Sequence, residues 1–199
     1  DERAAGQAYL VKHHITIHEE GAPLPCLTLA SAPFPAVVVK LLCLQPNFAE
    51  PSPVQAATWP VATAGRDVLA IAKTGSGKTL GFLLPVLAKC LLEKAAADGL
   101  PMALIMAPTR ELALQTFKFA QELSKFTDLR SVCIVGGDSM EAQFDDLASN
   151  PDLLVATPGR LLHHVEEISG FSIRAVSHVV LDEADRLLEM GFSDQLRDI

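Results

Sequence analysis

The sequence contains no apolar run long enough to cross a membrane, and its first residues lack the form of a signal peptide. Positive charge is also scarce: 16 Lys and Arg residues stand against 24 acidic ones, a formal net charge of −8. The net negative charge argues against a broad basic surface that binds nucleic acid. The excess of acidic residues is otherwise explained by ordinary solubility. It leaves room for a narrow site built from backbone amides and a few arginines. We expect a soluble, intracellular protein with no membrane partner.

Cysteine is rare, and its spacing excludes the usual frameworks. The four cysteines lie far apart: Cys26, Cys43, Cys90 and Cys133. Zinc sites need closely spaced ligand pairs, and disulfide frameworks belong to small secreted chains, so we expect buried free thiols. The two pairs of adjacent histidines point their side chains in different directions on a strand or a helix. A metal ion shared within either pair is therefore not expected.

Strand-like and helix-like segments alternate through most of the chain. Residues 1–33 are rich in Pro, Ala and His, and only the alternation over 14–18 hints at a strand. The apolar spacing over 34–44 predicts a helix. A second, short helix is predicted to begin over residues 55–59. Five apolar runs then follow, each ending in a polar or Gly/Pro turn before a helical stretch. These runs are Asp67–Ala72, Met102–Ala107, Ser131–Val135, Leu153–Ala156 and His178–Leu181.

Strands alternating with helices of this length predict an α/β fold. The crossovers are right-handed, and the sheet is mostly parallel and doubly wound, with helices on both faces. An apolar fraction of 49% is enough to cover both faces of such a sheet. The length of 199 residues fits one domain, 34–199, with a flanking segment, 1–33. In such sheets, ligands bind beyond the carboxyl ends of the strands.

A glycine-rich loop lies between the first apolar run and the helical run Leu80–Leu84. Its residues are Thr74, Gly75, Ser76, Gly77, Lys78 and Thr79. Consecutive amides there curl around the phosphates of a triphosphate, and the helix N-terminus adds positive potential. Lys78 reaches the β and γ oxygens, and Thr79 holds Mg²⁺ through its hydroxyl. Ala72 stands where the strict pattern has glycine, and the alternative is a turn that merely opens a helix.

An acidic box, Asp182–Asp185, directly follows the last apolar run. A carboxylate in this place can hold the Mg²⁺ shell, which fits Asp182. The next acid can orient or deprotonate the attacking water, which fits Glu183. Acids at a strand end also serve as helix N-caps, but Lys78 upstream favours the metal interpretation.

These two motifs resemble those of the DEAD-box ATP-dependent RNA helicases, whose name the acidic box spells. Pro51–Gln55 is similar to the Q motif of that family, whose glutamine reads the adenine edge. Three further segments resemble motifs that line the family's RNA path: Pro108–Ala113, Gly136–Gly137 and Thr157–Arg160. The resemblance covers about Ile15 to Ile199. It implies a RecA-like P-loop domain that binds ATP and Mg²⁺, with Gln55 on the adenine and Lys78, Asp182 and Glu183 in catalysis.

The implied RNA residues also make physical sense. They are Thr109, Arg110, Gly136, Gly137, Thr157 and Arg160. The two threonines stand where a strand gives way to a helix, so a hydroxyl and helix-start amides can meet a phosphate. The guanidinium groups of the two arginines have a forked geometry that suits phosphate oxygens. Contacts of this kind do not distinguish one base sequence from another. Taken alone, the threonines could simply cap helices and Arg110 could pair with Glu111.

Two features depart from the simplest match to the family. Leu29 occupies the place of the aromatic residue that stacks on adenine. The chain up to about Leu87 resembles the general RNA-remodelling branch, whereas Ala103–Ile199 resembles the nucleolar, ribosome-assembly branch. The sequence therefore predicts action in the nucleus, the nucleolus or the cytoplasm.

The resemblance implies an RNA-stimulated ATPase that locally unwinds or remodels RNA duplexes and RNA–protein complexes. The first alternative is an ATP-gated RNA clamp with little hydrolysis. The second is a DNA helicase or another P-loop ATPase, which the Q motif and the alanine-centred box disfavour. A complete enzyme needs a second RecA-like domain, which supplies an arginine finger and the other half of the RNA track.

The family's motif III, Ser-Ala-Thr, does not occur after Asp185. By resemblance to RecA-like ATPases, its strand belongs between Val68–Ala72 and the strand that ends at Asp182. We therefore expect these two strands to lie about twice the roughly 4.8 Å spacing apart, with no direct pairing. Unpaired inner edges are costly, so the chain alone is expected to be poorly stable, prone to aggregation and inactive.

Overall fold

The structure is a computed structural model that describes residues 1–43, 48–94, 99–168 and 170–199. It contains two compact units, Asp1–Lys89 and Cys90–Ile199, which are described separately. Leu44, the last residue of one predicted helix, lies outside the described residues. Within the described ranges, no helix combines the length and the apolar character that a bilayer crossing demands.

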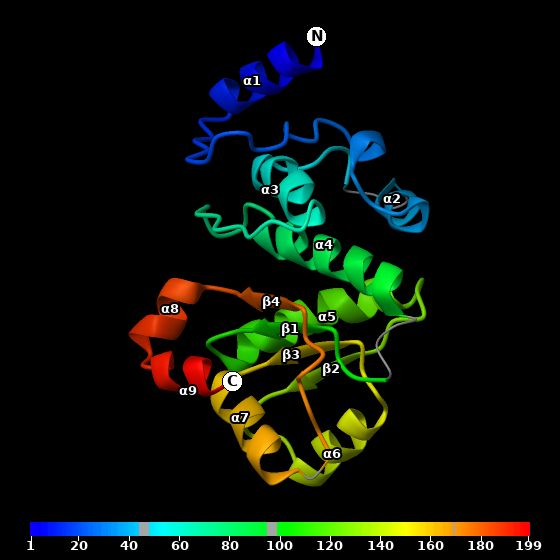
Figure 1. Cartoon of the computed structure of the whole chain (residues 1–199), viewed down its shortest axis with the longest axis vertical. Coiled ribbons are helices and arrows are strands. Elements are labelled where there is room, and N and C mark those ends of the chain that lie inside the picture. Colours follow the sequence, from blue (N-terminus) through cyan, green and yellow to red (C-terminus); the bar gives the residue numbers. More distant parts are fainter. Residues whose placement is uncertain (44–47, 95–98, 169) are drawn as a thin grey trace. The chain divides into compact units, whose positions relative to one another are not determined.

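The first unit is helical. It contains α1 (Glu2–Lys12), the 3₁₀ helix η1 (Leu29–Ser31), α2 (Ala36–Cys43), α3 (Pro53–Thr63) and most of α4 (Lys78–Glu93) (Figure 1). Trp59 is the centre of its core: the side chain is fully buried, and its Nε1 donates to Leu80 O at 3.1 Å. The Phe34 and Phe48 rings pack on it with centroids 5.0 and 6.4 Å away.

Two sequence predictions for this unit are wrong. Residues 14–18 form no strand, and the chain before them forms helix α1, which the Asp1 side chain caps by accepting from Arg3 N. The expected strand Asp67–Ala72 is also absent, and Leu69 and Ile71 are 87% and 95% exposed. A strand needs a hydrogen-bonding partner, and no described segment pairs with these residues. The apolar composition of Asp67–Ala72 is therefore not sufficient to make this segment a strand.

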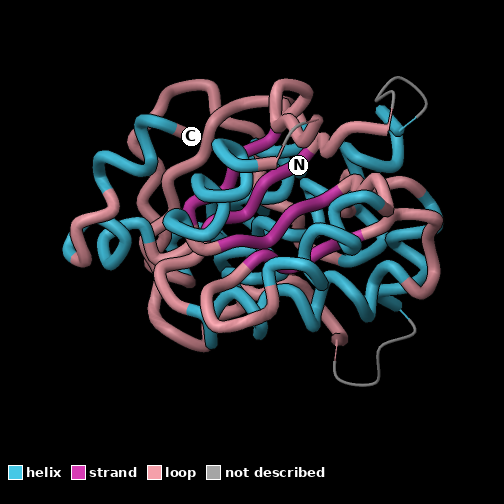
Figure 2. The backbone as a smooth tube through the Cα atoms, turned by 90° about the horizontal axis from the view of Figure 1, so that it is seen from below, coloured by secondary structure: helices cyan, strands magenta, loops and turns pink. Residues whose placement is uncertain are grey.

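The second unit is built on an all-parallel sheet with the strand order β2-β3-β1-β4 (Figures 1 and 2). The strands are β1 (Ala103–Met106), β2 (Ser131–Ile134), β3 (Leu153–Ala156) and β4 (His178–Leu181). The helices are the end of α4, α5 (Arg110–Ser124), α6 (Met140–Ala148), α7 (Pro158–Glu167), α8 (Ala184–Glu189) and α9 (Ser193–Asp198). The four predicted strands of this unit and the parallel α/β class are thus confirmed.

Helices cover both faces of this sheet. On one face, Leu104, Ile134 and Leu154 pack with Leu147 of α6 and Leu161 of α7 in one buried cluster. Helix α5 packs against β2 and β3, with its small buried residues Ala113, Thr116 and Ala120. β1 and β3, in the middle of the sheet, are buried throughout. This arrangement places the carboxyl ends of all four strands at one edge.

Strand β4 is at the margin of the sheet. Of the described strands it pairs only with β1. The strand expected over 68–72 does not form, so its predicted spacing from β4 stays a prediction. Val179 and Leu181 share the face of Leu104 and Met106 by register, yet they are 57% and 43% exposed. The buried face of the sheet therefore ends in an uncovered apolar margin.

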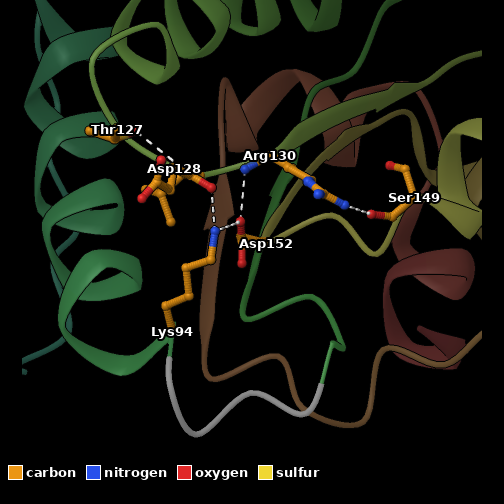
Figure 3. Close-up of polar contacts among 7 residues, drawn as sticks. Lys94, Thr127, Asp128, Arg130, Ser149 and Asp152 are labelled. Carbon is orange, nitrogen blue, oxygen red and sulfur yellow. Dashed lines mark hydrogen bonds and ion pairs between the residues drawn. The ribbon is translucent and has the colours of Figure 1, made fainter.

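A polar cluster closes the opposite edge, at the amino ends of β2 and β3 (Figure 3). Asp152 is 7% exposed, and its Oδ2 accepts from Arg130 N at 2.7 Å and from Lys94 Nζ at 3.1 Å. Lys94 Nζ also donates to the carbonyl of Asp128, and Arg130 Nη1 donates to Ser149 O at 2.6 Å. One carboxylate thus ties the end of α4 to the start of β2.

All four cysteines are free thiols. Cys26 and Cys90 are buried, as expected, whereas Cys43 is exposed at the end of α2, so the expectation of burial is wrong there. Burial raises the pKa of Cys90 and of the half-buried Cys133 to about 12. These two thiols stay protonated and unreactive at neutral pH.

Candidate functional site

The glycine-rich loop lies just before α4, which begins at Lys78. Gly75 and Gly77 have φ angles of +76° and +93°, in the left-handed region that favours glycine. A Cβ on Gly77 would lie 2.6 Å from Gln55 Nε2 and 2.9 Å from Ser52 Oγ. Glycine is required at 77 both by the backbone angle and by the close approach of α3.

Gln55 joins the Q motif to this loop. Its side chain is 2% exposed; Oε1 accepts from Ser52 N at 2.9 Å, and Nε2 donates to Gly77 O at 3.0 Å. The first bond is half of a capping box, which explains why α3 starts at Pro53. The amide keeps one further hydrogen and one further lone pair. Within the first unit, the predicted base-reading residue and the predicted phosphate-binding loop therefore lie in direct contact.

The remaining groups of the loop are suited to an oxyanion. Lys78 Nζ donates to Ala72 O at 2.6 Å, across the loop. Ser76 Oγ is buried and has no hydrogen-bond partner among the described residues. The first-turn amides of α4 also lack intrahelical acceptors. An ammonium group, an unpartnered hydroxyl and free amides together provide the donor set that phosphate oxygens require.

The acidic box follows β4 in the second unit. Asp182 N donates to Met106 O at 2.9 Å and so extends the ladder between β4 and β1. Glu183 has φ 49° and ψ 53°, a left-handed conformation that glutamate rarely adopts, and it stands at the N-cap of α8. Its carboxylate lies 3.4 Å from Arg186 Nη1. Such backbone strain, typically about 1–3 kcal/mol, clusters at functional sites, and here it turns the chain sharply between strand and helix.

The predicted magnesium ligands are Thr79, at the start of α4, and Asp182. They belong to different units, and each is described within its own. Among the residues with described positions, no three His, Cys, Asp or Glu side chains gather as a metal cage. Mg²⁺ in nucleotide sites is held by one or two protein oxygens together with phosphates and water. The Thr79 hydroxyl and the Asp182 carboxylate are each an oxygen ligand of the kind that Mg²⁺ takes.

The two arginines among the predicted RNA residues of the second unit reach the same loop, which contains the predicted Gly136 and Gly137. Thr109 caps α5, because its Oγ1 accepts from Leu112 N at 3.3 Å. Arg110 donates from Nη1 to Gly136 O at 2.9 Å, and its Nη2 lies 2.7 Å from Asp138 Oδ1. The partner of Arg110 is thus Asp138 and not Glu111. The hydrogen bond from Arg110 holds the pKa of Asp138 below its usual range.

The second arginine reaches the same loop from α7. Arg160 Nη1 donates to Asp138 O at 3.1 Å, to Met140 Sδ at 2.9 Å and to Gln143 Oε1 at 3.2 Å. Thr157 is the N-cap of α7, and its N donates to Ile134 O at 3.1 Å, although its hydroxyl makes no capping bond. The loop 136–140 is therefore held between two guanidinium groups at the carboxyl ends of β1, β2 and β3.

Sequence reasoning missed three residues of this face: Asp138, Gln143 and His164. Asp138 directly follows the glycine pair, and an acid next to a predicted phosphate-binding segment is a recognisable signal. Gln143 and His164 are 2% and 0% exposed. Their role depends on two helices packing together, for which the sequence offers no signal.

The parallel sheet and the phosphate loop define this protein as a P-loop nucleotide-binding domain with a RecA-like fold. Two solved structures resemble it closely. The yeast DEAD-box splicing factor Prp28 matches with a TM-score of 0.88 and 32% identity, over 100% of this chain and 47% of that chain. Prp28 from Chaetomium thermophilum, bound to ADP, matches with a TM-score of 0.83 and 35% identity, over 91% and 44%.

The profile of the DEAD/DEAH box helicases matches residues 52–199, and the chain belongs to that family. The DEAD-box ATP-dependent RNA helicase 29 of Oryza sativa subsp. indica is 53% identical over 149 residues, 75% of this chain. The ATP-dependent RNA helicase DDX54 of Mus musculus is 51% identical over 156 residues, 78% of this chain. The matched segments are 17% and 18% of the length of these two relatives.

Proposed function

We propose that the protein is an ATP-dependent RNA helicase, an RNA-stimulated ATPase that locally unwinds or remodels RNA duplexes and RNA–protein complexes. This chain is the ATP-binding half of its two-domain helicase core: a flanking segment, 1–33, and a helicase domain, 34–199. The supporting observation is the loop held by Arg110 and Arg160 at the carboxyl ends of the strands. A protein that grips a nucleic-acid backbone uses arginines and loop amides of this kind to contact phosphates. A P-loop ATPase that acts on other substrates does not need such a loop.

In the nucleotide site, Gln55 offers its free hydrogen and lone pair to the adenine edge. Lys78 shifts its Nζ from Ala72 O to the β and γ oxygens, where a full opposite charge is a stronger partner than a carbonyl. Thr79 and Asp182 are the residues that would each offer Mg²⁺ a protein oxygen, and the ion would neutralise the charge that develops on the phosphates. Glu183 orients the attacking water.

On the RNA side, the protein reads backbone and no bases. Arg110 exchanges the Asp138 carboxylate for an RNA phosphate, which is a comparable anionic acceptor. Arg160, the amides of Gly136 and Gly137, and the helix starts at Thr109 and Thr157 extend the track. A second RecA-like domain of the same protein supplies the arginine finger and the other half of the track. Because RNA is its substrate, the protein acts inside the cell, in the nucleus, the nucleolus or the cytoplasm.

Nucleotide binding and RNA-stimulated phosphate release by the full-length protein test this function. Lys78→Ala should abolish the binding of ATP and ADP. Lys73→Ala removes the same charge from an exposed position of the same loop and is the matched control. Phosphate release that RNA does not accelerate would instead support an ATP-gated clamp. Acceleration by DNA equal to that by RNA would refute the RNA assignment.

RNA binding should be weak, indifferent to sequence and sensitive to salt. Replacing Arg110 or Arg160 with alanine should reduce the salt slope by about one counterion each. A marked preference for one RNA over its scrambled sequence would contradict a track that contacts only the backbone.

A further inference from the structure

A buried polar pair lies directly behind Arg160 and has no part in the proposed chemistry. Gln143 of α6 and His164 of α7 are 2% and 0% exposed, and His164 Nε2 lies 2.8 Å from Gln143 Oε1. The same Oε1 accepts from Arg160 Nη1 at 3.2 Å, and Gln143 Nε2 donates to Val135 O at 2.8 Å. The pair therefore connects the RNA face to the end of β2.

The orientation of the Gln143 amide follows from its partners. A guanidinium only donates, so the amide atom facing Arg160 is the oxygen, and a carbonyl only accepts, so the atom facing Val135 O is the nitrogen. A carbonyl oxygen has two lone pairs, and here Arg160 and His164 occupy both. The amide has no second way to satisfy these three neighbours.

This orientation fixes the state of His164. Because Gln143 Oε1 carries no hydrogen, His164 Nε2 is the donor. In a neutral ring this single proton leaves Nδ1 as an unprotonated acceptor. Nδ1 is buried and has no hydrogen-bond partner among the described residues. Burial first, and then the neighbouring positive charge of Arg160, lower the pKa of His164, so the ring stays neutral.

Packing alone does not explain a histidine at this place. An apolar side chain would fill the same volume without leaving a buried nitrogen unsatisfied, which carries a real cost. The compensating gain is a donor aimed at Gln143 Oε1, which leaves that oxygen one remaining lone pair for Arg160. The Nε and Nη2 groups of Arg160 donate to no acceptor in the described parts of the chain, so they are left for an oxyanion.

We propose that His164 is a positioning residue for RNA binding: through Gln143, it holds the Arg160 guanidinium in the orientation that receives a phosphate. The inference rests on the proposed RNA function of this face. Without the His164 donor, the Gln143 amide is free to rotate, and Arg160 loses one of the acceptors that fix its Nη1. The affinity for RNA then falls because the guanidinium must be ordered on binding.

The test compares adjacent histidines in the full-length protein. His164→Leu should weaken the binding of a single-stranded RNA about three- to tenfold, the scale of one lost hydrogen bond. His163→Leu makes the same change at an exposed neighbour and should leave RNA affinity unchanged. His164→Gln restores a donor near the position of Nε2 and should recover most of the affinity. ATP binding should be equal in all variants.

A double-variant cycle separates positioning from general damage. In an Arg160→Ala background, His164→Leu should cause no further loss, because its effect passes through Arg160. An equal loss in both backgrounds, or no loss in either, would overturn the proposal.

Heteronuclear NMR gives a readout independent of RNA. The wild type should show the Nε2–H tautomer of His164 and slowed rotation of the Arg160 guanidinium, and His164→Leu should release that rotation. Unchanged Arg160 signals would overturn the positioning role even if RNA binds. Released signals in a protein that binds no RNA would support the positioning role and refute only the proposed function.

Discussion

Replacing Asp152 with alanine should destabilise the second unit substantially, although the residue lies at the opposite edge of the sheet from the predicted RNA residues. Two donors lose their acceptor: the Arg130 backbone N–H at 2.7 Å and Lys94 Nζ at 3.1 Å. A partly buried N–H left without an acceptor costs about 1–3 kcal/mol. The Lys94 side chain is 38% exposed and keeps the Asp128 carbonyl, so its share is at most about 1 kcal/mol. The total is about 1–4 kcal/mol.

Amide hydrogen exchange of the β2 residues in the full-length protein measures this loss of stability at the strand that directly follows Arg130. A loss of about 3 kcal/mol speeds exchange through global opening roughly a hundredfold, since about 1.4 kcal/mol corresponds to a factor of ten. Asp152→Asn keeps an oxygen for the Arg130 N–H and should cost about 1 kcal/mol.

Asp128→Ala is the matched control, because it removes a nearby exposed carboxylate and keeps the carbonyl that Lys94 uses. It should change stability by no more than about 0.5 kcal/mol. Equal exchange in the Asp152→Ala and Asp128→Ala variants would refute the argument. If Lys94→Met alone matched Asp152→Ala, the ion pair, and not the backbone bond, would carry the energy.

Three further predictions concern ligands. Asp138→Asn should tighten RNA binding, because a neutral amide competes less well than a carboxylate for Arg110. Arg110 holds the pKa of Asp138 below its usual range, so the carboxylate stays charged near neutral pH. The gain in RNA affinity should therefore be constant between about pH 5 and 8 and should fade only in stronger acid. A gain that already fades at neutral pH would contradict the pairing of Asp138 with Arg110. Gln55→Ala should mainly lose the preference for ATP over GTP, and equal weakening of both nucleotides would remove the adenine assignment. Leu29→Phe should tighten ATP binding by the roughly 0.5–1.5 kcal/mol of ring stacking and leave RNA binding unchanged, as checked by calorimetry; no gain would show that Leu29 does not face the adenine.

The sequence predicts the second unit well because local and long-range signals agree there. Each of β1 to β4 is an apolar run followed by a turn and a helix, and each finds a parallel partner. The segment Asp67–Ala72 has the same local pattern, yet it forms no strand, because pairing is a property of two segments and not of one. Composition identifies a strand candidate, and only a neighbour makes it a strand.

In the candidate site, too, the sequence predicts the features that depend on one segment and misses those that depend on the packing of two. Motif spacing predicts the phosphate loop and the two arginines, since their chemistry is local. It does not predict that Gln55 would contact the backbone of Gly77, or that Asp138 would occupy Arg110. Those contacts join residues from separate elements, so they follow from packing. The buried Gln143–His164 pair is the extreme case, because polar residues on helices are usually exposed.

The strand order has a consequence for the growing polypeptide. β1 is the first strand of the unit to be made, but its two partners, β3 and β4, come much later: Ala103 pairs with Leu153 on one side and with His178 on the other. At about 5–20 residues per second, ribosomal synthesis separates Ala103 from His178 by roughly 4 to 15 seconds. Throughout that interval Leu104 and Ile105, which are almost fully buried in the finished protein, have at least one backbone edge open, and both edges are open until β3 has been made. A nascent chain of this design therefore offers chaperones a long-lived apolar strand, and the arrival of β4 ends that exposure.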